Sequence, residues 1–113
     1  MISEFKIAQS RSGVFHFGYV RIQVQSSLRS QVVNSIAKPV NTSDAEVDET
    51  HYEWFTAAVN GVQSALEYIT KYTDEKFIVE IVCIKGVEVD TQSEDIKECA
   101  FMATTKAVLD PQI

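Results

Sequence analysis

The sequence predicts an α+β domain, a two-layer sandwich in which two helices cover one face of a four-stranded, mostly antiparallel sheet. Residues 19–25 alternate strictly between apolar and polar side chains, which indicates a strand with one buried and one wet face. Residues 77–84 are the most apolar run, as in a central strand. Segments with helical periodicity lie on either side of that run. The expected order is strand, strand, strand, helix, strand, helix.

The N-terminal third contains the first three predicted strands. Residues 2–9 alternate loosely, and residues 10–13 are typical of a turn. Residues 19–25 form the clearest strand, and after a polar turn residues 31–37 form a weaker one. This segment is therefore expected to contribute three of the four strands of the sheet.

Two capping boxes mark the expected helix starts, one at residues 50–53 and one at residues 91–94. The first helix carries an apolar stripe at positions 55, 59, 62, 66 and 69. Its glycine, Gly61, costs roughly 1 kcal/mol against alanine and predicts close packing against the sheet. Small residues along the second helix predict a close approach to its neighbour, and Pro111 ends this helix.

Composition and charge limit the classes of function. The 113 residues fit one domain spanning positions 1–113, and 45% hydrophobic residues exclude wholesale disorder. The formal net charge is −6, from 10 Lys and Arg against 16 Asp and Glu. Proteins that bind nucleic acid usually present a basic face. The overall charge therefore favours solubility or a basic partner, and it leaves a local basic patch as the alternative.

Few side chains in this sequence could carry catalysis or bind a metal. Cys83 and Cys99 lack CxxC spacing and are expected to be reduced thiols, although a disulfide between them stays open. His16 is expected in a loop and His51 early in the first helix, with no zinc-like spacing. There is no phosphate-binding glycine loop and no GxSxG elbow. The sequence therefore predicts no enzyme, no cofactor and no metal.

The location of the protein is predicted from its apolar segments. Residues 1–10 lack the apolar core of a signal peptide. The longest apolar stretch, residues 77–84, is interrupted by Glu80 and is too short to span a bilayer. We expect a cytoplasmic protein with no membrane partner.

Residues 11–21 are the most informative segment for function, because basic and aromatic side chains alternate there. Aromatic rings stack on unpaired bases and basic groups contact phosphates, which favours an RNA- or ribosome-binding site. The alternative is that the phenylalanines enter the core of the protein. The candidate RNA- or ribosome-binding residues are Arg11, Phe15, His16, Phe17, Tyr19 and Arg21.

Several segments, in the same order, resemble the fourth domain of translation elongation factor G. Gly13 with residues 17–24 resembles its first loop and alternating strand, and residues 33–36 resemble its next strand. The remaining matches are its first helix at residues 52–54, 58–62 and 65–66, its central strand at residues 79–81, and the run into and along its last helix at residues 89–91 and 102–103. The resemblance spans residues 3–109.

This resemblance implies an unusual left-handed crossover around the first helix, and a lever whose tip loops enter the ribosomal decoding region. Residues 11–17 would match the first tip loop and residues 85–88 the second. The chain departs from the family in carrying a shorter second loop without a histidine, a single glycine in the first loop, and an acidic segment at residues 41–49. Without a GTPase domain, a stand-alone domain of this kind is not expected to be a translocase.

Two hypotheses for function follow. In the first, the chain is a non-enzymatic binding protein, a ribosome or RNA adaptor that uses the candidate residues above. In the second, it is an acidic protein–protein interaction module, an inhibitor or immunity protein that binds a basic partner. The partner-binding residues would then be Asp44, Glu46, Asp48 and Glu49, which lack the spacing of a calcium loop.

Overall fold

The computed structural model describes residues 1–35, 52–87 and 90–109. The predicted acidic site at residues 44–49, His51 and the start of the first capping box lie outside these residues. The order of the described elements confirms the prediction. The elements are β1 (Ile2–Arg11), β2 (Val14–Ser27), β3 (Gln31–Asn34), α1 (Tyr52–Ile69), β4 (Lys76–Lys85) and α2 (Ser93–Leu109).

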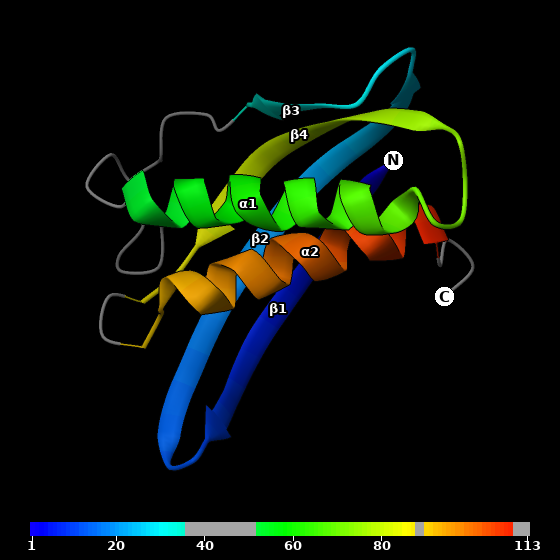
Figure 1. Ribbon diagram of the computed structural model, residues 1–113. Coiled ribbons are helices and arrows are strands. Elements are labelled where there is room, and N and C mark those ends of the chain that lie inside the picture. The colour runs from blue at the N-terminus through cyan, green and yellow to red at the C-terminus, as the bar shows by residue number, and fades with distance from the viewer. Residues whose placement is uncertain (36–51, 88–89, 110–113) are drawn as a thin grey trace.

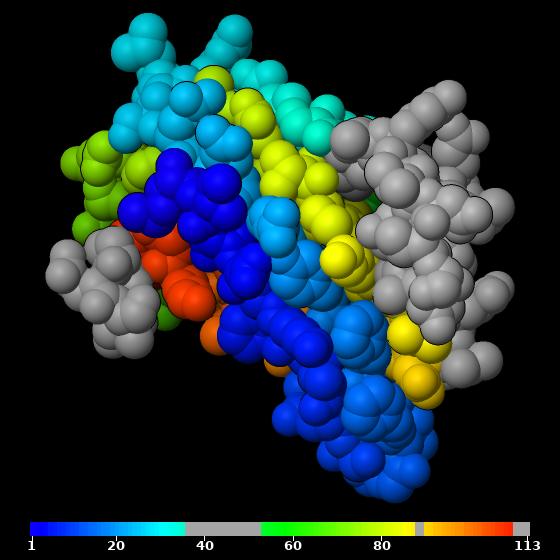
Figure 2. Space-filling view, turned by 180° about the vertical axis from the view of Figure 1, so that it is seen from behind, coloured from blue at the N-terminus to red at the C-terminus, as the bar shows by residue number. Residues whose placement is uncertain are grey.

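The four strands form one mixed sheet in the order β1-β2-β4-β3. β2 pairs antiparallel with both β1 and β4, whereas β3 pairs parallel with β4 at the edge. Both helices lie on the same face of this sheet (Figure 1), and neither of them covers the opposite face, which we call the open face (Figure 2). The predicted two-layer α+β sandwich is therefore confirmed.

The connection from β3 to β4 has an uncommon hand. In Figure 1 the helices face the viewer, β3 and β4 both run from right to left, and β4 lies below β3. The path from β3 through α1 to β4 is therefore a left-handed crossover. Nearly all connections of this type are right-handed, so this feature agrees with the resemblance described above.

The β1–β2 hairpin is longer than predicted. β1 reaches Arg11 and β2 begins at Val14, so only Ser12 and Gly13 form the turn. Their φ angles are 52° and 83°, and two positive values are typical of the type I′ turn that matches the twist of paired strands. The predicted turn at residues 10–13 and tip loop at residues 11–17 are corrected accordingly.

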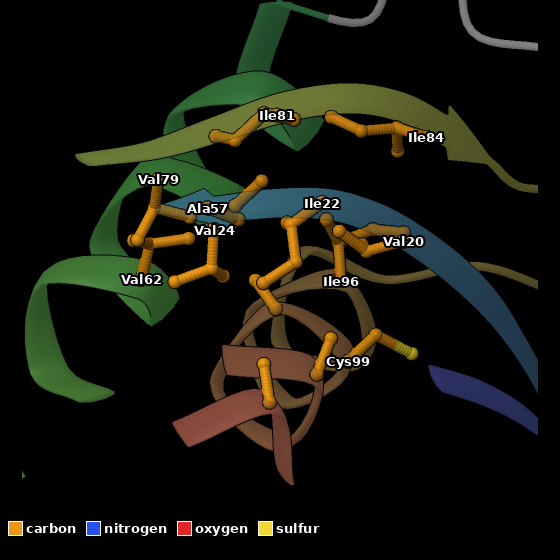
Figure 3. Close-up of a cluster of buried hydrophobic side chains, with 14 of the residues drawn as sticks. Val20, Ile22, Val24, Ala57, Val62, Val79, Ile81, Ile84, Ile96 and Cys99 are labelled. Carbon is orange, nitrogen blue, oxygen red and sulfur yellow. The ribbon is translucent and has the colours of Figure 1, made fainter. Parts of the chain in front are cut away.

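The hydrophobic core lies between the sheet and the two helices. Ile22 and Ile81 from the central strands, with Ile69 and Ile96 from the helices, are at most 1% exposed. Figure 3 shows side chains of β2 and β4 directed toward the helices, with Val62 and Ile96 among their neighbours. Such burial is the main favourable contribution to folding.

Gly61 allows the two helices to approach each other closely. A Cβ atom at this position would collide with the carbonyl oxygen of Lys97 and would lie 2.9 Å from the Cβ of Ala100. Gly61 therefore packs against α2, and the expectation that it packs against the sheet is wrong. The expectation that the small residues of α2 permit a close approach is confirmed.

The buried face of α1 is rotated from the predicted apolar stripe. Trp54 is only 4% exposed, and the small residues Ala58 and Ala65 are completely buried. Phe55 and Leu66, two members of the predicted stripe, are only partly buried at the rim of the core. Alanines carry little hydropathy signal, yet they are the residues that let α1 lie close to its neighbours.

The start of α2 differs by one residue from the predicted capping box. The carboxylate of Asp95 accepts a hydrogen bond from the backbone amide of Gln92 at 3.0 Å, as the third helical residue of such a box does. Thr91, the predicted cap, donates its hydroxyl to the carbonyl oxygen of Phe17 and accepts from the amide of Val87, both at 2.7 Å. Thr91 therefore connects β2 to the segment before α2.

Candidate nucleic-acid interface

The closed end of the β1–β2 hairpin projects beyond both helices, as Figures 1 and 2 show. Near this end Val14 is 52% exposed and Phe15 is 44% exposed. Large apolar side chains so exposed at a projecting turn are available to a partner. We refer to residues 11–17 as the hairpin tip.

The six candidate residues lie on two different faces of the hairpin. Alternation along β2 directs Phe17, Tyr19 and Arg21 to the open face of the sheet, together with Phe15. His16 points to the opposite side, toward α2, as its contact with Asp95 shows. The six residues were predicted to form one site, whereas the structure divides them between two faces.

Two of the candidate residues attach the hairpin to α2. The Nδ1 atom of His16 lies 3.0 Å from each carboxylate oxygen of Asp95, whose side chain is only 3% exposed. The guanidinium of Arg11 donates to both carboxylate oxygens of Glu98 at 3.3 Å. His16 is thus a strand residue with a structural contact, which corrects its predicted place in a loop.

The open face carries a hydrogen-bonded cluster of three side chains. The hydroxyl of Tyr19 donates to Glu4 at 2.6 Å, and Nε of Arg21 donates to Glu4 at 3.3 Å and to the Tyr19 hydroxyl at 3.0 Å. Burial and the bond to Glu4 raise the pKa of Tyr19 to about 12. The bond from Tyr19 lowers the pKa of Glu4. Tyr19 is therefore a neutral, hydrogen-bonded ring at physiological pH.

Cations surround the aromatic rings on this face. The Nζ atom of Lys85 lies 5.6 Å from the centre of the Tyr19 ring, and the guanidinium carbon of Arg21 lies 5.8 Å from it. The Nζ atom of Lys6 lies 5.8 Å from the centre of the Phe17 ring. These distances are typical of cation–π contacts. The local charge near Tyr19 is therefore positive although the chain as a whole is acidic.

Lys6 and Lys85 were not among the site residues predicted from the sequence. Lys6 lies 13 positions before Tyr19, and Lys85 was assigned to the second tip loop although it is the last residue of β4. Tyr19 pairs directly with Lys6 on one side and with Lys85 on the other. The signal for both lysines is strand register, which a single sequence specifies poorly before the partners are known.

Other kinds of site are not found in the parts of the chain that the structure describes. Residues 1–35, 52–87 and 90–109 contain no group of three or more metal-ligating side chains. Within the same ranges, neither helix combines the length and apolar character needed to cross a bilayer. The two cysteines are reduced thiols, so the alternative of a disulfide is wrong.

Fold and site together define this chain as an α+β sandwich with a left-handed crossover, a projecting hairpin and an aromatic, basic open sheet face. No family model matches the chain, and no curated protein does so either. A crystal structure of a protein from Thermus thermophilus is similar in fold, with a TM-score of 0.67. The similarity covers 93% of this chain at 16% identity but only 15% of the larger protein. At this identity it shows the fold alone.

Proposed function

We propose that this chain is a non-enzymatic RNA-binding adaptor, related to the fourth domain of translation elongation factor G, that acts on ribosomal RNA. The observation that supports the proposal is the row of side chains that β2 presents on the open face, from Phe15 at the hairpin tip through Phe17 and Tyr19 to Arg21. Exposed rings stack on unpaired bases of any sequence, and neighbouring cations contact the phosphates.

The shape of the molecule supports the same proposal. The hairpin tip projects from the sandwich, and the left-handed crossover agrees with the elongation-factor resemblance. Arg11 and His16 then serve to hold the hairpin against α2 and do not contact RNA themselves. The proposed contact consists of the four residues on the open face.

The net charge of −6 is compatible with this function if the contact is small. Each neutralised phosphate contributes to the salt dependence of binding, so a site with few cations has a shallow slope. We expect binding that depends strongly on stacking and weakly on salt.

Co-sedimentation with small ribosomal subunits at low salt tests the proposal. We expect the chain to pellet with the subunits, and Phe15→Ala combined with Arg21→Ala to reduce the pelleted fraction. The matched control is Leu28→Ala with Arg29→Ala, which also removes one exposed apolar side chain and one arginine, at the opposite end of β2. No pelleting at low salt, or equal loss in both double variants, contradicts the proposal.

The second function, an acidic module for a basic protein partner, rests on Asp44, Glu46, Asp48 and Glu49. These residues lie outside the described part of the chain, so no structural observation supports that site. Capture of one basic protein that is lost when these four acids are neutralised would favour this function over RNA binding.

A further inference from the structure

We propose that the open sheet face binds single-stranded RNA at a row of three residues, Lys6, Tyr19 and Lys85, which lie side by side on three strands. An unpaired base stacks on the ring of Tyr19, and the two lysines contact the phosphates on either side. This inference rests on the proposed function for the class of ligand. It extends the site from β2 onto β1 and β4, away from the hairpin tip.

The row is set by the register of the sheet. Lys6 pairs with Tyr19, and Tyr19 pairs with Lys85, so all three side chains leave the same face. Neighbouring strands lie about 4.8 Å apart, which places the two lysine Cα atoms about 10 Å apart. Long, flexible lysine side chains can reach phosphates on both sides of one stacked base. Figure 2 looks onto this face, where the three strands lie next to one another.

The two lysines are available to a ligand. Among the described residues, the ion pairs of this face involve Arg21 with Glu4, and neither Lys6 nor Lys85 belongs to one. Each ammonium group instead lies near an aromatic ring. A positive charge without a carboxylate partner, beside an aromatic ring, is the combination that single-stranded nucleic-acid sites use.

Replacement of a cation–π contact of these lysines by a stacked base increases the binding constant for RNA. An exposed cation–π contact contributes roughly a twofold to fivefold factor to an equilibrium constant. Stacking of one base on an aromatic ring contributes about fivefold to 150-fold. A base can therefore replace the ammonium group of Lys85 over the Tyr19 ring. The released ammonium group then contacts a phosphate of the RNA backbone.

The same geometry argues for a single strand over a duplex or an acidic protein. A duplex hides the base faces inside its stack, so only an unpaired base can cover Tyr19. An acidic peptide could pair with the lysines, but it offers no flat ring for the tyrosine. Both of these ligands are therefore competitors in the test.

Fluorescence anisotropy with a labelled single-stranded RNA of mixed sequence tests this inference. We expect Tyr19→Leu to weaken binding about fivefold to twentyfold, because leucine cannot stack on a base. Tyr19→Phe retains the ring and should stay within about twofold. Lys6→Ala with Lys85→Ala should reduce the slope of log affinity against log salt by about 1.4, as expected for two phosphate contacts to a single strand.

The helix layer offers a matched control. The Nζ atom of Lys71 lies 5.4 Å from the centre of the Tyr68 ring, which is the same kind of contact on the other side of the molecule. Tyr68→Leu with Lys71→Ala should leave RNA affinity within about twofold of the unchanged protein. Thermal unfolding of each variant shows that the fold is intact.

Several outcomes overturn the inference. These are no binding of the single strand at low salt, equal affinity for the duplex, unchanged affinity in Tyr19→Leu, and displacement of RNA by equimolar poly-glutamate. The last outcome would indicate an acidic protein partner. Co-sedimentation of the unchanged protein with ribosomal subunits separates the two proposals. Pelleting without binding of the single strand contradicts this inference alone, whereas binding of the single strand without pelleting contradicts the ribosomal target alone.

Discussion

The two faces of β2 are built from alternate residues of one strand, yet they have opposite chemistry. On the helix side, Val20 and Ile22 are completely buried and Gly18 lies against α2. On the open side, Tyr19 and Arg21 form hydrogen bonds and ring contacts at the surface. The buried side contributes to the stability of the fold, whereas the open side carries the residues that we propose to contact RNA. Substitutions on the two sides should therefore change different measurements.

The largest effect on stability is expected at Ile22, which is completely buried on the helix side. Ile22→Ala removes core contacts and leaves a cavity, which should lower the free energy of unfolding by about 2–5 kcal/mol. Gln23→Ala, the exposed neighbour on the open side, should change it by less than about 0.5 kcal/mol. Urea denaturation measures both. Equal effects at the two positions would show that the faces are not distinct.

The difference between the open face and the buried side should also appear in the chemical reactivity of the two cysteines. Cys83 pairs with Arg21 and shares its open face, whereas Cys99 is completely buried on α2. Burial raises the pKa of the Cys99 thiol to about 12, which leaves almost no reactive thiolate. Alkylation of Cys99 should therefore be at least about a hundredfold slower than that of Cys83. Mass spectrometry of digests after timed alkylation measures the ratio, and similar rates would contradict the prediction.

A third prediction concerns the helix layer that covers the buried side. Gly61→Ala gains about 1 kcal/mol of helix propensity but forces α1 away from the backbone of α2. We expect a net loss of about 2 kcal/mol in the free energy of unfolding. Gly13→Ala is a useful reference, since a Cβ there meets nothing within 4 Å and the cost comes from its positive φ alone. A raised melting temperature for Gly61→Ala would contradict the close packing.

The smallest expected effect is at Tyr19. Its pKa of about 12 in the folded protein exceeds the ordinary value of 10.0, so above pH 10 the folded state retains a proton that the unfolded chain loses. The stability contributed by this group is complete below pH 10 and is lost as pH rises through 12. Spectroscopic titration of phenolate should show a late step that Tyr19→Phe removes. Persistence of that step would assign it to another tyrosine, such as Tyr68, whose pKa is raised by its hydrogen bond to Tyr72.

Local patterns in the sequence were sufficient to predict the order and type of the elements. Strict alternation predicted β2, and the helical periodicity that reaches position 69 predicted the helix that ends at Ile69. The hairpin was harder to predict, because Phe15 is exposed and Phe17 is half-buried on the open face, and these two rings hide the alternation around His16. Apolar side chains that lie at the surface interrupt the alternation of apolar and polar residues from which a strand with one buried face is recognised.

The candidate site was predicted only in part. The aromatic and basic residues of β2 were found because they are adjacent in sequence. The contact between His16 and Asp95 joins residues 79 positions apart, and the row of Lys6, Tyr19 and Lys85 joins three strands. Such relations follow from strand register and helix docking, which no local pattern encodes.

The full-length pairing of the hairpin has a mechanical consequence. All ten residues of β1 pair with β2, from Ile2 to Arg11. The backbone hydrogen bonds between the two strands run along the whole arm, and the Ser12–Gly13 turn joins the strands at its end. A load applied at the turn is therefore shared by both strands and carried to the part of the sheet that the helices cover. The projecting arm should move as one unit and not as two separate strands.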